Sequence, residues 1–126
     1  MGLCRVDVTL GNPADRSVAP LQVAALVDTG ALHLCIPEHV AIQLALAELE
    51  KREVTMADGS RRLVPYVGPV EVRFEKRRCF VGAMVLGDEP LLGVIPIEDM
   101  DLVVHPATRQ LVVNPQTPNV PGSVAK

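Results

Sequence analysis

Alternation of apolar and polar residues marks several short segments of the chain, and this period of two is the pattern of half-buried β-strands. In residues 4–10 every second side chain is apolar, and the segment ends at the turn residues 11–13. Residues 21–27 are almost continuously apolar, which predicts a central strand with both faces covered. Further strands are predicted at residues 34–36, 70–74, 79–86, 102–104 and 111–113. The pattern therefore indicates a mostly β fold.

One segment has the spacing of a helix instead. Ile36, Val40 and Leu44 recur at helical intervals, and Pro37 suits the first position of a helix. The spacing predicts one main helix, from Pro37 to about Leu49.

A tight hairpin is predicted where residues 54–57 meet residues 60–64. Between them lies Asp58-Gly59, a dipeptide favoured in hairpin turns because glycine adopts positive φ without steric cost. We expect this hairpin to be exposed and mobile.

The length of 126 residues and the formal charge of −3 suit one compact domain. We expect that domain to span residues 1–114. Residues 115–126 are rich in Pro, Asn, Gly and Ser and have little to bury, so they predict a flexible tail. A processing site or a tether is a hypothesis for this tail.

Composition also excludes several classes of partner. Asp28 interrupts the most apolar stretch, so no run approaches the roughly 20 residues of a membrane helix. Only 2% of residues are aromatic and the balance is acidic, which argues against nucleic acid. The start of the chain lacks a basic segment followed by an apolar core, so we expect a cytoplasmic protein. Cys4, Cys35 and Cys79 are widely spaced and odd in number, which predicts reduced thiols.

Asp28 is the residue with the strongest claim to a chemical role. It ends an apolar strand, where an ionised carboxylate must be hydrogen-bonded or neutralised. Thr29 and Gly30 follow it, and Ala31 completes the motif. The simplest alternative is a turn in which the Asp28 side chain caps nearby amides.

The order of motifs resembles the retroviral-type (retropepsin-like) aspartic proteases, and their small cellular relatives in particular. The resemblance rests on Asp28-Thr29-Gly30-Ala31, Cys35-Ile36-Pro37, the hairpin at Asp58-Gly59 and Leu91-Leu92-Gly93, and it covers roughly residues 3–92. It implies a single-domain, closed, barrel-like β fold equivalent to half of a pepsin. It also implies an aspartic endopeptidase that acts on peptides or proteins without a cofactor.

The resemblance assigns a role to each motif. Asp28 would be the catalytic acid and base, and Thr29, Gly30 and Ala31 would organise its loop. Leu91, Leu92 and Gly93 would support that loop from below. The hairpin Ala57-Asp58-Gly59-Ser60 would be a flap over the substrate. Leu32, Met56 and Val94 are candidates for the walls of the substrate pockets.

Because the chain has one Asp-Thr-Gly and the family uses two aspartates, the resemblance implies a homodimer. Leu32 and Val94 stand where retroviral members commonly carry an acidic residue and an arginine that pair with each other. An alternative is a catalytically inactive module of the same fold that binds peptides or dimerises.

His33, Cys35 and His39 lie close together in the sequence. A strand followed by a helix would point them in different directions, and no fourth residue recurs at zinc-like spacing. We therefore assign no metal site.

Overall fold

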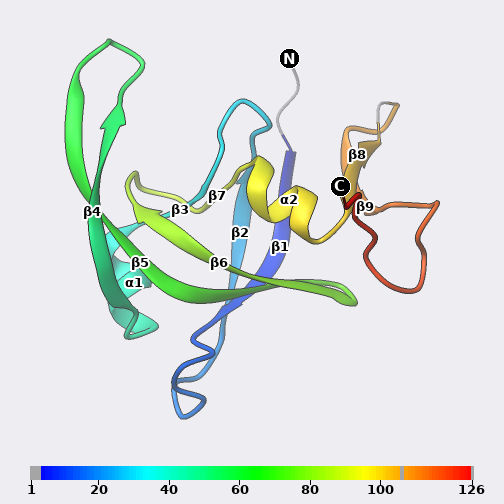
Figure 1. Cartoon of the computed structure of the whole chain (residues 1–126), viewed down its shortest axis with the longest axis horizontal. Coiled ribbons are helices and arrows are strands. Elements are labelled where there is room, and N and C mark those ends of the chain that lie inside the picture. The colour runs from blue at the N-terminus through cyan, green and yellow to red at the C-terminus, as the bar shows by residue number, and fades with distance from the viewer. Residues whose placement is uncertain (1–3, 106, 126) are drawn as a thin grey trace.

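Six strands close into a barrel in the computed structural model, which describes residues 4–105 and 107–125 (Figure 1). Along these residues the elements are β1 (Cys4–Gly11), β2 (Leu21–Val27), β3 (Leu34–Ile36), α1 (Glu38–Gln43), β4 (Ala47–Thr55), β5 (Arg61–Phe74), β6 (Arg77–Val85), β7 (Leu91–Leu92), α2 (Val94–Asp99), β8 (Leu102–His105) and β9 (Gln110–Val113). The mostly β class predicted from the sequence is confirmed.

The barrel closes because β1 pairs on both of its edges. Strand order in the main sheet is β1-β2-β7-β3-β6-β5-β4, and β1 returns to pair with β5 through Thr9, Leu10 and Gly11. Strand β4 stays outside this ring and pairs with the first half of β5, on the same edge that pairs with β1 farther along the strand. Most neighbours are antiparallel, but β7 lies parallel to β2, and β3 lies parallel to β6. A separate two-stranded sheet is formed by β8 and β9.

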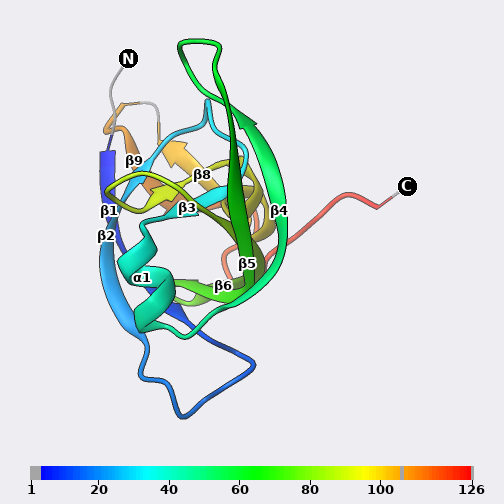
Figure 2. The same cartoon turned by 90° about the vertical axis from the view of Figure 1, so that its left-hand side faces the viewer.

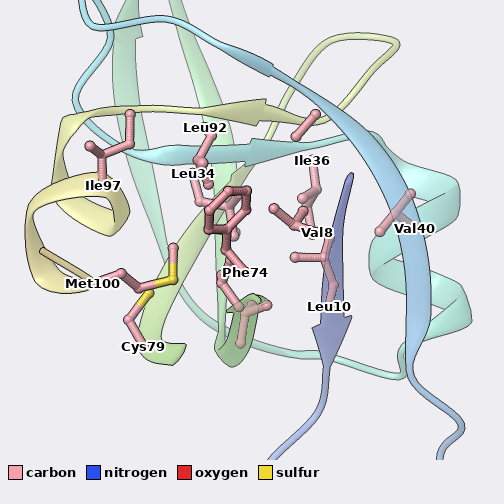
Figure 3. Close-up of a cluster of buried hydrophobic side chains, with 14 of the residues drawn as sticks. Val8, Leu10, Leu34, Ile36, Val40, Phe74, Cys79, Leu92, Ile97 and Met100 are labelled. Carbon is pink, nitrogen blue, oxygen red and sulfur yellow. The ribbon is translucent and has the colours of Figure 1, made fainter. Parts of the chain in front are cut away.

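The core fills the barrel with the inward-facing residues of these strands (Figure 3). On β1 the alternation predicted from the sequence places Val8 and Leu10 inside, at 2% and 0% exposure. They meet Leu34, Ile36 and Leu92 in one cluster. Cys79, Ile97 and Met100 extend that cluster toward α2.

Two expectations about individual elements are wrong. Strand β2 has two neighbours, but Gln22 and Ala24 are exposed, so only one of its faces is covered. The helix α1 ends at Gln43 rather than near Leu49. Directly after the helix, the Leu44 and Ala45 carbonyls accept hydrogen bonds from the buried Asn12 side chain, and Ala45 turns the chain with φ of 52°.

The longest strand, β5, joins two segments that the sequence pattern separates. The sequence pattern predicts residues 60–64 and 70–74 as separate strands, and Pro65, Gly68 and Pro69 lie between them. The β5–β6 register shifts between Val67 and Val70, so this irregularity accommodates the proline and the strand continues. As a result, the β4–β5 hairpin projects well beyond the barrel (Figure 2).

Residues after β9 contact the turn that follows α2. The Asp101 carboxylate accepts hydrogen bonds from the side chains of Asn114 and Thr117 and from the Gly122 amide at 2.8 Å. The buried Arg77 guanidinium donates to the Met100 carbonyl at 2.9 Å and to the Thr117 carbonyl. The flexible tail beyond residue 114 stays a prediction.

The helices among the described residues, α1 and α2, are each too short to span a membrane.

Candidate active site

Asp28 lies in the connection between β2 and β3, directly after the last residue of β2. Its backbone amide donates to the Leu92 carbonyl at 3.1 Å, and two residues earlier the Leu26 amide donates to the Pro90 carbonyl at 2.9 Å. These bonds continue the parallel pairing of β2 with β7 into the loop. The position of Asp28 is therefore set by the sheet.

Asp28, Thr29 and Gly30 form a tight turn at the surface. The Gly30 amide donates to Asp28 Oδ1 at 2.9 Å, and the Ala31 amide donates to the Asp28 carbonyl at 3.1 Å. Asp28 is half-buried, whereas Thr29 and Gly30 are exposed. A side chain at position 30 would place its Cβ 3.1 Å from Asp28 Oδ1, so glycine gives the carboxylate room. One carboxylate oxygen is thus oriented by the backbone of its own turn.

The segment after β7 closes against the same loop. The Val94 amide donates to the Ala31 carbonyl at 2.9 Å, and the Ile95 amide donates to the Leu32 carbonyl at 2.8 Å. Gly93 is buried between them, and a Cβ there would lie 2.4 Å from the His33 carbonyl oxygen. Only glycine fits at that distance, so the close approach of the two backbones depends on Gly93.

The tip of the β4–β5 hairpin is stabilised by bonds within itself. Met56 and Ser60 pair through a backbone hydrogen bond of 2.7 Å, and Gly59 has φ of 87°. The Asp58 carboxylate accepts from the Ser60 amide at 2.9 Å and from the Ser60 hydroxyl. Both views place this tip at the end of the molecule that carries the β2–β3 connection (Figures 1 and 2). Among the described residues no hydrogen bond joins the tip to Asp28.

Only some of the site residues predicted from the sequence lie together in the structure. Asp28, Ala31 and Leu32 meet the segment 92–95 through the backbone bonds given above. Leu32 is 57% exposed, and Val94 and Met56 are half-buried, so all three present apolar surface. The hairpin tip stays apart from this group.

Tyr66 was not singled out by the sequence pattern, yet it connects the hairpin stem to the Asp28 loop. Its ring packs edge-to-face on His33 with the centroids 6.1 Å apart, and the Arg52 guanidinium lies 3.8 Å from its centroid. The ring occupies the space above Gly82, where a Cβ would come within 2.1 Å of Tyr66 Cζ. Burial, and to a lesser extent the Arg52 charge, lowers the pKa of His33. Sequence spacing carries no signal for this cluster, because its members come from four separate segments.

Cys35 lies on β3 near the Asp28 carboxylate. Burial, and then the Asp28 charge, raises the pKa of its thiol. A thiol with a raised pKa stays protonated at neutral pH, which is the wrong state for a nucleophile. No group of three or more His, Cys, Asp or Glu residues in the described part of the chain is arranged to hold a metal ion.

Comparisons with known proteins agree with this architecture. No protein-family model and no curated protein matches the sequence. Among solved structures, the solution structure of the simian foamy virus (mac) protease superposes with a TM-score of 0.50 and 14% identity, over 75% of this chain and 91% of that one. The chain has a retropepsin-like fold.

A retropepsin-like aspartic protease from Rickettsia conorii also matches, with a TM-score of 0.48 and 16% identity, over 88% of this chain and 91% of that one.

Proposed function

We propose that the protein is a homodimeric aspartic endopeptidase in which each chain contributes one Asp28. The observation that carries this proposal is the placement of Asp28 in a retropepsin-like fold. It lies at the end of β2 with its amide bonded to Leu92 and one carboxylate oxygen bonded to the Gly30 amide. The carboxylate is therefore oriented before any substrate binds.

A dimer is required by the number of carboxylates. The chain contains one Asp-Thr-Gly and no Asp-Ser-Gly, and aspartic protease chemistry uses two aspartates that share a proton. A two-fold axis beside the exposed Thr29 and Gly30 would bring two Asp28 side chains together. Thr29 would then hydrogen-bond across the axis, as the family resemblance implies, and hold the two loops in register.

In the dimer one Asp28 carboxylate is ionised and its partner is protonated, because neighbouring like charges do not both ionise easily. The ionised carboxylate takes a proton from a water molecule as the water oxygen attacks the scissile carbonyl carbon. The protonated carboxyl polarises the carbonyl oxygen. When the carbon–nitrogen bond breaks, the carboxyl that gained a proton delivers it to the leaving amine.

The segment that contains Leu91, Leu92 and Gly93 serves this chemistry as a support. Leu92 is fully buried, and its carbonyl accepts the Asp28 amide. Gly93 permits the close contact with the His33 carbonyl. Neither residue touches the substrate in this proposal, so both are positioning residues.

The β4–β5 hairpin would be the flap. It extends beyond the barrel at the end where Asp28 lies, and Ala57, Asp58, Gly59 and Ser60 are all exposed at its tip. An extended peptide beneath it would add as a strand and exclude water from the two carboxylates. Leu32, Met56 and Val94 would offer apolar contacts to its side chains.

The experiment is cleavage of a mixed peptide pool by wild type and Asp28→Asn, from acidic to neutral pH and at several protein concentrations. Mass spectrometry identifies the cleaved bonds. We expect cleavage to disappear in Asp28→Asn and, in the wild type, to rise faster than linearly with protein concentration. Asp7→Asn is the matched control, because Asp7 is an exposed aspartate on β1 and should leave cleavage unchanged.

Cleavage that persists in Asp28→Asn would overturn the proposal. A wild type that binds peptides but cleaves none of them, at any concentration or pH, would favour a non-catalytic module of the same fold. Sedimentation of the same samples then shows whether that module is a dimer or a monomer.

A further inference from the structure

A second cluster of charged residues lies at the opposite end of the molecule from the Asp28 loop. The β1–β2 connection lies at this end, and the tip of the β4–β5 hairpin lies at the other end (Figures 1 and 2). A cavity of about 170 Å³ opens between this connection and β5. Arg16 lines it from the connection, Thr9 from β1, and Glu71 and Arg73 from β5.

Glu71 lies at the centre of three guanidinium groups. The residue is 5% exposed. Arg16 donates to its Oε1, Arg78 donates to its Oε2 at 3.3 Å, and Arg73 Nη2 lies 3.5 Å from the same Oε2. The hydrogen bond from Arg16 lowers the pKa of Glu71 in spite of burial, and the charges of Arg73 and Arg78 act in the same direction. The carboxylate is therefore ionised at neutral pH.

The cluster carries more positive charge than its structure requires. One carboxylate is matched by three guanidinium groups, so the four side chains sum to +2 in a protein whose formal charge is −3. Each arginine turns one nitrogen toward Glu71, whereas a guanidinium carries five N–H donors. The side chains of Arg16, Arg73 and Arg78 are 64%, 54% and 55% exposed, so the remaining donors face solvent.

We propose that this cavity binds a phosphate group, with Arg16 and Arg73 as its principal ligands. A phosphate dianion would neutralise the surplus charge of +2, which a single carboxylate cannot do. Planar guanidinium forks match the geometry of phosphate oxygens, and two of them from different segments converge on one cavity. Thr9 lines the same cavity, and its hydroxyl would donate a further bond.

Glu71 has a positioning role in this site. It gathers the three arginines within reach of one carboxylate and thereby reduces the entropy that they would lose on binding an anion. A bound phosphate would also link Arg16, in the β1–β2 connection, to Arg73 on the barrel. The inference does not rest on peptidase activity.

The test is titration of the whole protein with inorganic phosphate at low ionic strength and pH 7.5, followed by amide chemical shifts or calorimetry. We expect saturable binding that perturbs residues around the cavity. Arg16→Gln and Arg73→Gln should each weaken it at least about tenfold, the loss of one charge-assisted hydrogen bond pair. Arg5→Gln is the matched control, because Arg5 is an exposed arginine with a single carboxylate partner, Glu89.

Thermal unfolding without phosphate shows whether each variant is folded. A linear, non-saturating response, or equal weakening by Arg5→Gln, would overturn the proposal. Acetate at the same ionic strength should not compete. A phosphoserine peptide titrated beside its unphosphorylated form distinguishes the source of the group: tighter binding than inorganic phosphate indicates a phosphorylated protein, and equal or weaker binding indicates a free phosphate compound.

Discussion

The loop that carries Asp28 and the tip of the β4–β5 hairpin lie at the same end of the molecule but are stabilised in opposite ways. The Asp28 loop is bonded to a second segment through the carbonyls of Ala31, Leu32 and Leu92. The hairpin tip makes its hydrogen bonds within residues 56–60. The proposed function needs this contrast, because a catalytic carboxylate would have to stay in place while a flap opens.

Gly93→Ala gives the largest expected effect, because it disrupts the contact between the Asp28 loop and the segment after β7. The new Cβ would lie 2.4 Å from the His33 carbonyl oxygen and 2.7 Å from the Leu32 carbonyl carbon, and both are backbone atoms that cannot rotate away. We expect a loss of about 3 kcal/mol in the free energy of unfolding, as for an overpacked core. Urea denaturation measures it.

Gly11→Ala is the control for that variant, since its nearest neighbour would be Pro20 Cβ at 3.9 Å. A Gly93→Ala protein as stable as Gly11→Ala would show that the two backbones do not approach closely in solution.

Asp101→Asn tests the turn that follows α2, and we expect an intermediate effect. Hydrogen bonds from Asn114, Thr117 and Gly122 lower the pKa of Asp101 to about 2 from its ordinary 3.8. A carboxyl with a depressed folded pKa stabilises the protein above its unfolded pKa, and this stabilisation disappears as the pH falls through the folded value.

The stability difference between wild type and Asp101→Asn should therefore be full above pH 4 and decrease toward pH 2. Asparagine tolerates the φ of 55° at this position, so the substitution adds no backbone strain and changes only the side chain. Thermal unfolding as a function of pH measures the difference. A constant difference across that range would show that the Asp101 charge does not stabilise the fold.

Gly59→Ala should have a smaller effect, because it alters the hairpin tip. Nothing lies within 4 Å of the added Cβ, so the cost comes only from the φ of 87°. A residue other than glycine loses about 1 kcal/mol when its backbone adopts the left-handed conformation. Denaturation midpoints measure it, and Gly59→Asn should recover part of the loss. A cost equal to that of Gly93→Ala would mean that the tip is packed against another part of the protein.

Asp58→Asn should have the smallest effect of the four. Burial plays little part at this exposed tip, and hydrogen bonds from Ser60 lower the pKa of Asp58. An asparagine side-chain oxygen accepts the same bonds from the Ser60 amide, so the turn is kept. We expect an unchanged unfolding midpoint at neutral pH. A clear loss would show that the charge itself, rather than the turn geometry, stabilises the tip.

Much of the fold could be predicted from local sequence, and the wrong boundaries of helices and strands have identifiable causes. Period-two alternation located β1, because Val8 and Leu10 face the core while the residue between them points outward. Helical spacing found the start of α1 but not its end, which depends on Asn12, a residue far away in the sequence. Likewise, the sequence pattern separated residues 60–64 from residues 70–74, whereas a register shift within β5 lets one strand continue through both.

Some residues of the candidate site could likewise be predicted from the sequence, and others could not. Asp28 and Gly93 could be selected from motifs, because each motif is contiguous in the sequence. Tyr66 could not, since its packing on His33 and over Gly82 arises only when three segments meet. The arginines around Glu71 also come from separate segments, so no contiguous motif marks them.

The continuous strand β5 limits how the length of the hairpin can change in evolution. Arg61–Phe74 runs from the hairpin into the barrel and pairs with β4, β6 and β1. One residue inserted within it would exchange the inward and outward faces on one side of the insertion. Homologues should therefore lengthen or shorten this hairpin by pairs of residues, or at the tip between Met56 and Ser60, where an insertion leaves the register of the barrel unchanged.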